Sequence, residues 1–366
     1  MATQHLDPTD PTASEVTGDA LAGYLRSQAT EFLRALRLHR ENGSGGGAPA
    51  GAYSSVGENG AEESVDAARA LRRSARRISG SLHTFRPLLD TDWSEEMRPE
   101  LAWLSGTLGL EHAYESRLER LLLALHRLSG STSLPAQAVI TTDLAAGGRA
   151  AGPTPTPERG NLTVGAAKAG ALLERQLTLA RTRAHSTALQ ALGSSRFHAV
   201  ADKVAVLASE VLLTPTAPTT DLRPLAAAAE ERLTDAIAAL PLLTAGHPYN
   251  AEALVHGLSP DPSPHPQDGP WHQVRLLLRL HRYAREVLYA GSAPVDVRLL
   301  AAGQALNRHR DASEAAAAAA QAARTPRIAP ATAYALGVLH ADQRHEVEAA
   351  RFAFQQAWQK ETVNAP

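Results

Sequence analysis

Cysteine is absent from all 366 residues. Disulfides, thiolate zinc sites, iron–sulfur clusters and cysteine nucleophiles are therefore excluded. Lysine occurs only three times among 36 basic residues, so nearly all the positive charge is arginine. Aromatic residues make up only 4 % of the chain, and Ala, Leu and Arg dominate its periodic segments. Because this composition favours helix over strand, we predict an all-α protein.

Long apolar runs are also missing, because arginine interrupts the leucine-rich segments every few positions. Residues 1–16 lack the basic and then apolar pattern of a secretory signal, so we expect a flexible tail there. Without a membrane span, the chain is predicted to be cytoplasmic and to have no membrane partner. The net charge of -2 gives no whole-surface attraction for nucleic acid, so any anion site must be local.

Hydrophobic periodicity predicts about a dozen helices separated by segments rich in Gly, Pro, Ser and Thr. The predicted helices cover about residues 18–40, 64–86, 94–108, 111–128, 164–192, 196–213, 271–290, 296–308, 311–323, 330–339 and 342–360, with others after residue 223. Residues 41–60 and 130–160 are predicted loops, and Ser194 is a predicted helix cap. We expect a first helical bundle over 17–213, a linker over 214–222 and a second bundle over 223–362.

The two halves of the chain resemble each other. An offset of 203 positions aligns Arg69 with His272, Arg72 with Arg275, and Arg76 with Arg279. We infer an internal duplication that produces two pseudo-symmetric helical bundles, one from each half.

The second basic helix carries a polar stripe where a helix normally carries leucine. His272, Arg275, Arg279 and Arg282 recur at spacings of three, four and three. The residues between them are largely apolar, so an ordinary solvated face is not expected. The stripe is predicted to line an interior or a cavity.

The first basic helix repeats this arrangement with Arg69, Arg72, Arg73, Arg76 and Arg77. No Asp or Glu occurs from residue 69 to 86 or from 271 to 285, so local ion pairs are absent. Because an unpaired buried charge costs about 3–5 kcal/mol, these arginines need carboxylates from other helices, water or an external polyanion. The planar guanidinium suits phosphate, and we favour the polyanion. The alternative is a solvated stripe, or pairing with acids such as Glu62, Glu115 or Glu174.

Motifs for other chemistries are missing. No HExxH, GxxxxGK[ST], GxSxG or strand-associated GxGxxG occurs, so we predict no catalytic residues, no metal site and no cofactor. An enzyme that acts on a phosphate polymer or a nucleotide would need metal carboxylates, and Asp311 and Glu314 are the only acids near the basic stripe. The basic helices also lack interleaved aromatics for base stacking, which disfavours nucleic acid as a partner.

Several motifs agree in order with those of one family. They are LHTFRPLLD at 82–90, LLERQL at 172–177, SSRF at 194–197, WHQVRLLLRLHRYA at 271–284 and LNRHRDA at 306–312. In these motifs the chain resembles the CHAD family, the conserved histidine α-helical domain. The resemblance implies two helical bundles around a central basic pore, non-enzymatic binding of inorganic polyphosphate, and association with polyphosphate granules and their protein partners.

The resemblance implies a set of polyphosphate-binding residues. These candidates are Arg69, Arg72, Arg73, Arg76, Arg77, His272, Arg275, Arg279, Arg282, Arg308 and His309. Three positions depart from the family pattern: Arg69 replaces its first histidine, Ser79 replaces an arginine, and Ala113 replaces an aspartate. An alternative function is therefore a degenerate scaffold that binds a protein partner and no longer binds polyphosphate.

Overall fold

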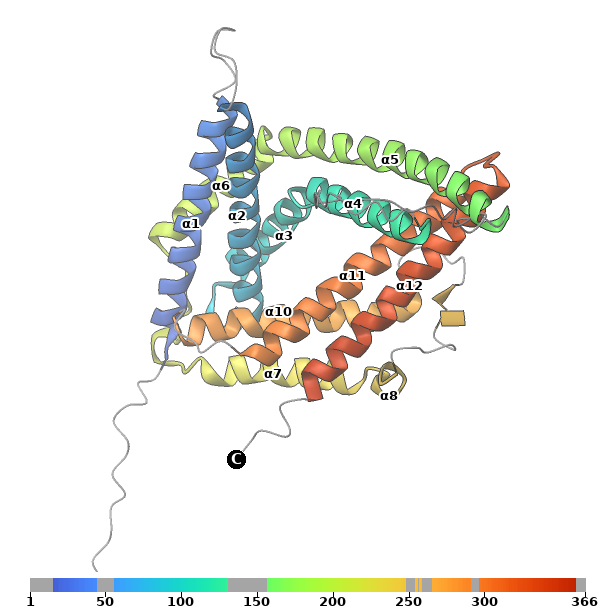
Figure 1. Cartoon of the computed structure of the whole chain (residues 1–366). Coiled ribbons are helices and arrows are strands. Elements are labelled where there is room, and N and C mark those ends of the chain that lie inside the picture. The colour runs from blue at the N-terminus through green and yellow to red at the C-terminus, as the bar shows by residue number, and fades with distance from the viewer. Residues whose placement is uncertain are drawn as a thin grey trace, which may run out of the picture. The chain divides into compact units, whose positions relative to one another are not determined.

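The computed structural model describes residues 16–44, 56–130, 157–247, 254–255, 257–258, 265–290 and 296–359. Its helices are α1 (Gly18–Ser44), α2 (Val56–Thr84), α3 (Thr91–Thr107), α4 (Leu110–Leu128), α5 (Pro157–Leu192), α6 (Ser195–Ser209), α7 (Arg223–Ala238), α8 (Leu242–Ala245), α10 (Gly269–Leu288), α11 (Val297–Ala323) and α12 (Pro330–Gln359) (Figure 1). Short 3-10 helices are η2 (Arg86–Leu88), η3 (Ala217–Thr219) and η4 (Pro266–Asp268). Among the described residues, β pairing is limited to one bridge between Leu89 and Leu213. The prediction of an all-α protein is confirmed.

The chain divides into two compact units, each of which draws on several segments. Unit 1 contains residues 1–109, 188–235 and 277–295, and unit 2 contains residues 110–187, 236–276 and 296–366. Each unit therefore takes segments from both sides of the predicted linker at 214–222. The internal duplication and the bundle boundaries stay predictions.

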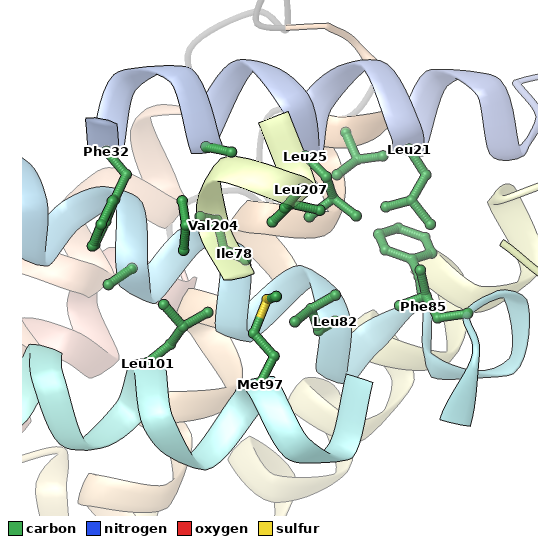
Figure 2. Packing of buried hydrophobic residues seen from close by; sticks show 14 of the residues in the cluster. Leu21, Leu25, Phe32, Ile78, Leu82, Phe85, Met97, Leu101, Val204 and Leu207 are labelled. Atoms are coloured by element: carbon green, nitrogen blue, oxygen red, sulfur yellow. The ribbon is translucent and has the colours of Figure 1, made fainter. Parts of the chain in front are cut away.

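The core of unit 1 is built on one apolar stripe of α2. Leu71, Ala75, Ile78 and Leu82 recur at spacings of four, three and four, and all four are fully buried. Figure 2 shows Ile78 and Leu82 among labelled side chains from α1, α3 and α6. Burying each large aliphatic side chain contributes about 1.5–3 kcal/mol. This stripe determines which way the remaining side chains of α2 face.

In unit 2, α11 and α12 run side by side. Buried alanines of α11, including Ala315, Ala319 and Ala322, pack in one cluster with Leu336 and Leu339 of α12. The alanine run at residues 315–320 favours helix by its intrinsic propensity. The structure adds a packing role, because small side chains let two helix backbones approach closely.

Local signals set several helix ends. Ser194 caps α6 as predicted, since its side chain accepts a hydrogen bond from the backbone of Phe197. Asp90 caps α3 in the same way through the backbone of Trp93. Helix α2 ends at Thr84, shortly before Pro87, which lies in η2.

Two predicted helix breaks are wrong. Helix α11 continues through residues 309–310, and α12 continues through residues 340–341. Neither segment contains Gly or Pro, and buried side chains such as His309 and Gln343 hold these turns in the core. Helix α2 also begins within the predicted 41–60 loop, at Val56, and α6 ends at Ser209. The predicted tail up to residue 15 and most of both predicted loops lie outside the described residues.

Among the described helices, none combines the length and apolar character that a membrane span requires.

Close backbone contact at Gly165 gives a test of the packing in unit 2. A Cβ atom there would lie 2.2 Å from the carbonyl oxygen of Ala331, at the start of α12. We expect Gly165→Ala to lower the free energy of unfolding by about 1–3 kcal/mol, measured by chemical denaturation. The matched control is Gly170→Ala on the same helix, where the nearest atom would be an ordinary 3.5 Å away. That control should be neutral or stabilising by about 0.5–1 kcal/mol, because alanine favours helix. Equal stability of the two variants would contradict the packing described.

Candidate functional site

The arginines of α2 lie on the side of the helix that faces away from the apolar stripe in the core of unit 1. Arg69 and Arg73 are exposed, and Arg72, Arg76 and Arg77 are half-buried. Arg69 forms an exposed i, i+3 ion pair with Asp66 at 3.2 Å, so the expectation that the basic helices lack local ion pairs is wrong at this position. Because leucine and isoleucine at 71, 78 and 82 face the core, the arginines point away from it. The packing thus gathers these cationic groups on one unit without burying them completely.

Arg72 is held by the end of α3. Its Nε donates a hydrogen bond to the carbonyl oxygen of Ser105 at 3.1 Å. Its guanidinium also occupies the space beside Gly109, where a Cβ atom would lie 2.5 Å from Cζ. These contacts fix the direction of the side chain. The sequence contained no direct signal for them, because they depend on how α3 packs.

Arg77 binds a carboxylate of α10 that the sequence reasoning missed. Its Nε and Nη2 donate to the two oxygens of Glu286, at 2.7 and 3.2 Å. Tyr24 of α1 donates its hydroxyl to Glu286 Oε2 at 2.8 Å. Burial alone lowers the pKa of Arg77, but the hydrogen bond and charge of Glu286 outweigh burial, so the pKa is raised. Burial and Glu286 both raise the pKa of Tyr24.

A glycine lets the end of α10 reach this position. A Cβ atom at Gly80 of α2 would lie 2.6 Å from Cδ2 of Tyr283 on α10. The Tyr283 ring also lies 5.8 Å from the guanidinium carbon of Arg77. The close approach places Glu286, one turn further along α10, beside Arg77.

Arg77, Glu286 and Tyr24 border a surface pocket in unit 1 with a volume of about 540 Å³. Its lining consists of Tyr24, Ser27, Gln28, Glu31, Ala70, Arg73, Ser74, Arg77, Glu286 and Ala290. The pocket therefore contains two arginines, three hydroxyls and an amide, which are suitable donors for an oxyanion, together with the carboxylates of Glu31 and Glu286.

The stripe of α10 lies beside the residues that the helix buries. Trp271, Val274, Leu278 and His281 are buried, whereas His272, Arg275 and Arg279 are half-buried and Arg282 is exposed. Arg275 Nε donates to Asn307 Oδ1 of α11 at 2.9 Å. Arg308 of α11 is exposed.

A buried ionic cluster in unit 2 was not predicted. Asp268 accepts hydrogen bonds from Arg344, at 2.8 and 3.2 Å, and from Arg351, at 2.8 Å. Arg351 also donates to Glu348 at 2.8 Å and lies 5.3 Å from the Trp271 ring. All four charged side chains are at most 5 % exposed. A sequence signal existed: residues 344, 348 and 351 repeat at helical spacings of four and three on α12.

His309 belongs to this cluster. Its side chain is 1 % exposed, and its ring stacks on Trp271 with centroids 5.6 Å apart. Because Nε2 accepts a hydrogen bond from Arg351 Nε at 3.3 Å, the proton of the neutral ring lies on Nδ1. Burial, followed by the charge of Arg351, lowers the pKa of His309 to about 3. In the structure His309 therefore supports the helices around it from within the core.

His272, the first residue of the basic stripe of α10, contacts the buried ionic cluster. Its ring contacts the His309 ring edge-on, with centroids 5.5 Å apart. Burial lowers the pKa of His272, so this histidine is mainly neutral at neutral pH.

Of the acids considered as partners for the basic stripe, Glu115 binds elsewhere. Glu115 pairs with Arg181 at 3.1 Å and with His112 at 3.6 Å. The side chains of the described part of the chain contain no cluster of three or more His, Asp or Glu residues suited to hold a metal ion.

The sequence matches the CHAD domain family over residues 56–294. The chain therefore belongs to this family, as its motifs predicted. It is also similar to a solved structure, that of PptA from Streptomyces chartreusis. The two share 70% sequence identity, the match covers 95% of this chain and 100% of that chain, and the TM-score is 0.74. A comparison with the curated proteins found no match. The family membership supports a polyphosphate-related role.

The lowered pKa of His309 makes the stability of the protein depend on pH. The ring has a pKa of about 3 in the folded chain against 6.5 in a model peptide, so the unfolded chain binds its proton first as pH falls. Stability is then lost from about pH 6.5 down to pH 3, with a slope of at most about 1.4 kcal/mol per pH unit. We expect His309→Gln to flatten this slope in denaturation experiments between pH 7 and 4.

The control for this experiment is His345→Gln, which changes an exposed histidine on α12. It should keep the slope of the unsubstituted protein. An equally steep slope in the His309 variant would contradict the assignment.

Proposed function

We propose that this protein binds inorganic polyphosphate, without catalysing a reaction on it, through the arginines of α2 and α10. The observation that carries the proposal is the arginine-rich face of α2 in a member of the CHAD family. Five arginines lie within nine residues of one helix, on the face that points away from the core, and they are half-buried or exposed. A linear polyanion satisfies such a face better than isolated small anions do.

The binding is electrostatic. Arginines replace the counterions condensed on the polymer, so affinity falls steeply as salt concentration rises. The planar fork of each guanidinium engages two phosphate oxygens and stays charged at any physiological pH. In unit 1 the contacts come from Arg72, Arg73, Arg76, Arg77, Arg279 and Arg282, and in unit 2 from His272, Arg275 and Arg308.

Two histidines have different roles in this proposal. The ring of His309 is buried, so this residue supports the binding residues by packing against Trp271 and His272 and does not contact the polymer itself. His272 adds charge only below its ordinary titration range, so it strengthens binding at acidic pH. The central pore, granule association and a granule protein partner remain predictions from the family resemblance.

The proposal predicts a loss of affinity and of salt dependence when exposed arginines are neutralised. In Arg73→Gln/Arg282→Gln, both altered side chains are exposed, so the fold should persist. We expect about 10-fold or greater weakening of medium-chain polyphosphate binding, measured by isothermal titration calorimetry at two salt concentrations. The slope of log K against log salt should become shallower by about 0.7 for each lost contact.

The matched control is Arg37→Gln/Arg223→Gln, which removes the same charge from exposed ion pairs of unit 1. This control should keep the affinity for polyphosphate within about twofold. In a separate competition experiment, single-stranded DNA should not displace polyphosphate from the unsubstituted protein. Equal effects of the two double variants would contradict a local site. If the unsubstituted protein does not bind polyphosphate even at low salt, the alternative of a scaffold for a protein partner is favoured.

A further inference from the structure

Glu286 places a carboxylate where the arginines of unit 1 would otherwise meet an external anion. It accepts two hydrogen bonds from Arg77 and one from Tyr24, at 2.7 to 3.2 Å. Its side chain is 25 % exposed, so the pair lies at the surface of the pocket and not in the core. A planar guanidinium fork with a neighbouring hydroxyl is also the donor set that a phosphate oxyanion requires.

The rest of the pocket offers further donors. Ser27 and Gln28 of α1 and Arg73 and Ser74 of α2 line the same volume of about 540 Å³. Glu31 also lines it, and its carboxylate is paired with Arg34. That volume falls within the range of about 300–1,000 Å³ typical of small-ligand sites. All these residues belong to unit 1, so the site requires no residue of unit 2.

We infer that this pocket is a subsite for a phosphate group of the polymer, in which Glu286 is a resident counter-anion. An incoming phosphate displaces the carboxylate from Arg77 and takes over its hydrogen bonds. Glu286 thus weakens binding and excludes anions that compete less strongly than phosphate for the fork. The inference rests on the proposed function, because the displacing group comes from polyphosphate.

A purely structural role for the ion pair makes a different prediction. If the Arg77–Glu286 pair only holds α10 against α2, removing the carboxylate should lower the free energy of unfolding and leave the affinity for polyphosphate unchanged or weaker. If Glu286 competes with the ligand, removing it should strengthen binding, because Arg77 then offers its full charge. The sign of the change in affinity therefore separates the two roles.

The test is Glu286→Gln, which keeps the size of the side chain and an oxygen acceptor but removes the charge. We expect the Kd for medium-chain polyphosphate to fall about 10-fold, and the salt slope to steepen by about 0.7 as one more contact forms. The matched control is Glu100→Gln in the same unit. Glu100 also forms a two-bonded pair with an arginine, Arg196, and is 26 % exposed, but it lies outside the pocket. This control should change the Kd less than twofold.

A double-mutant cycle locates the effect at Arg77. In the background of Arg77→Gln, the substitution Glu286→Gln should no longer strengthen binding, because the fork that the carboxylate occupies is gone. Glu286→Met removes the charge with a side chain of similar length, and it should reproduce the increase if the glutamine variant folds poorly. Melting temperatures of all variants are measured in parallel.

The outcomes separate this inference from the proposed function. If the unsubstituted protein binds polyphosphate but the Glu286 variants bind no more tightly than Glu100→Gln, the counter-anion role is overturned and the proposed function stands. The counter-anion role is also overturned if Glu286→Gln still increases the affinity in the Arg77→Gln background. If no variant binds polyphosphate, the proposed function itself fails.

Discussion

The orientation of α2 depends on one constraint, the burial of its apolar stripe in the core of unit 1. Leu71, Ile78 and Leu82 are fully buried, and turning the helix would expose all of them at a cost of several kcal/mol. The arginines of the same helix must therefore point away from this core. This orientation of α2 lets Arg72 bind the end of α3 and lets Arg77 pair with Glu286 of α10. The proposed site is thus a consequence of hydrophobic packing.

The ion pairs of Arg344 and Arg351 in unit 2 are buried more deeply than the ion pair of Arg77 in unit 1. In unit 2, Arg344 and Arg351 are buried together with Asp268 and Glu348, and their hydrogen bonds are directed at one another. Removing one partner of such a buried pair costs about 3–5 kcal/mol because the other charge is left unpaired, and burial closes these groups to a polymer. In unit 1, Arg77 and Glu286 each retain more than a fifth of their side-chain surface beside a pocket. At this degree of exposure, Arg77 can exchange its internal partner, Glu286, for an external anion such as phosphate.

The parts of the fold that could be predicted are those that depend on local sequence. Helical periodicity, the cap at Ser194 and the motif around LHTFRPLLD were sufficient for the all-α class and the CHAD family. The breaks expected within α11 and α12 were wrong, because residues such as His309 and Gln343 are buried by tertiary packing and the helices continue through these turns. The basic residues were recognised as a set, but Glu286 and Asp268 were not assigned to them. Their pairing joins segments far apart in the chain, and no spacing rule connects such segments.

The sequence by itself determined the helical class, the absence of cysteine chemistry and the concentration of arginine on two helices, because composition and periodicity act within a few turns. Only the tertiary structure decided which charged groups meet. Arg77 and Glu286 are separated by 209 positions, and Gly80 lets their helices approach closely enough to pair. The same holds for the burial of His309, whose pKa is lowered by desolvation and by an arginine of another helix. Burial and long-range pairing control the charge of a side chain, and both arise only when the chain folds.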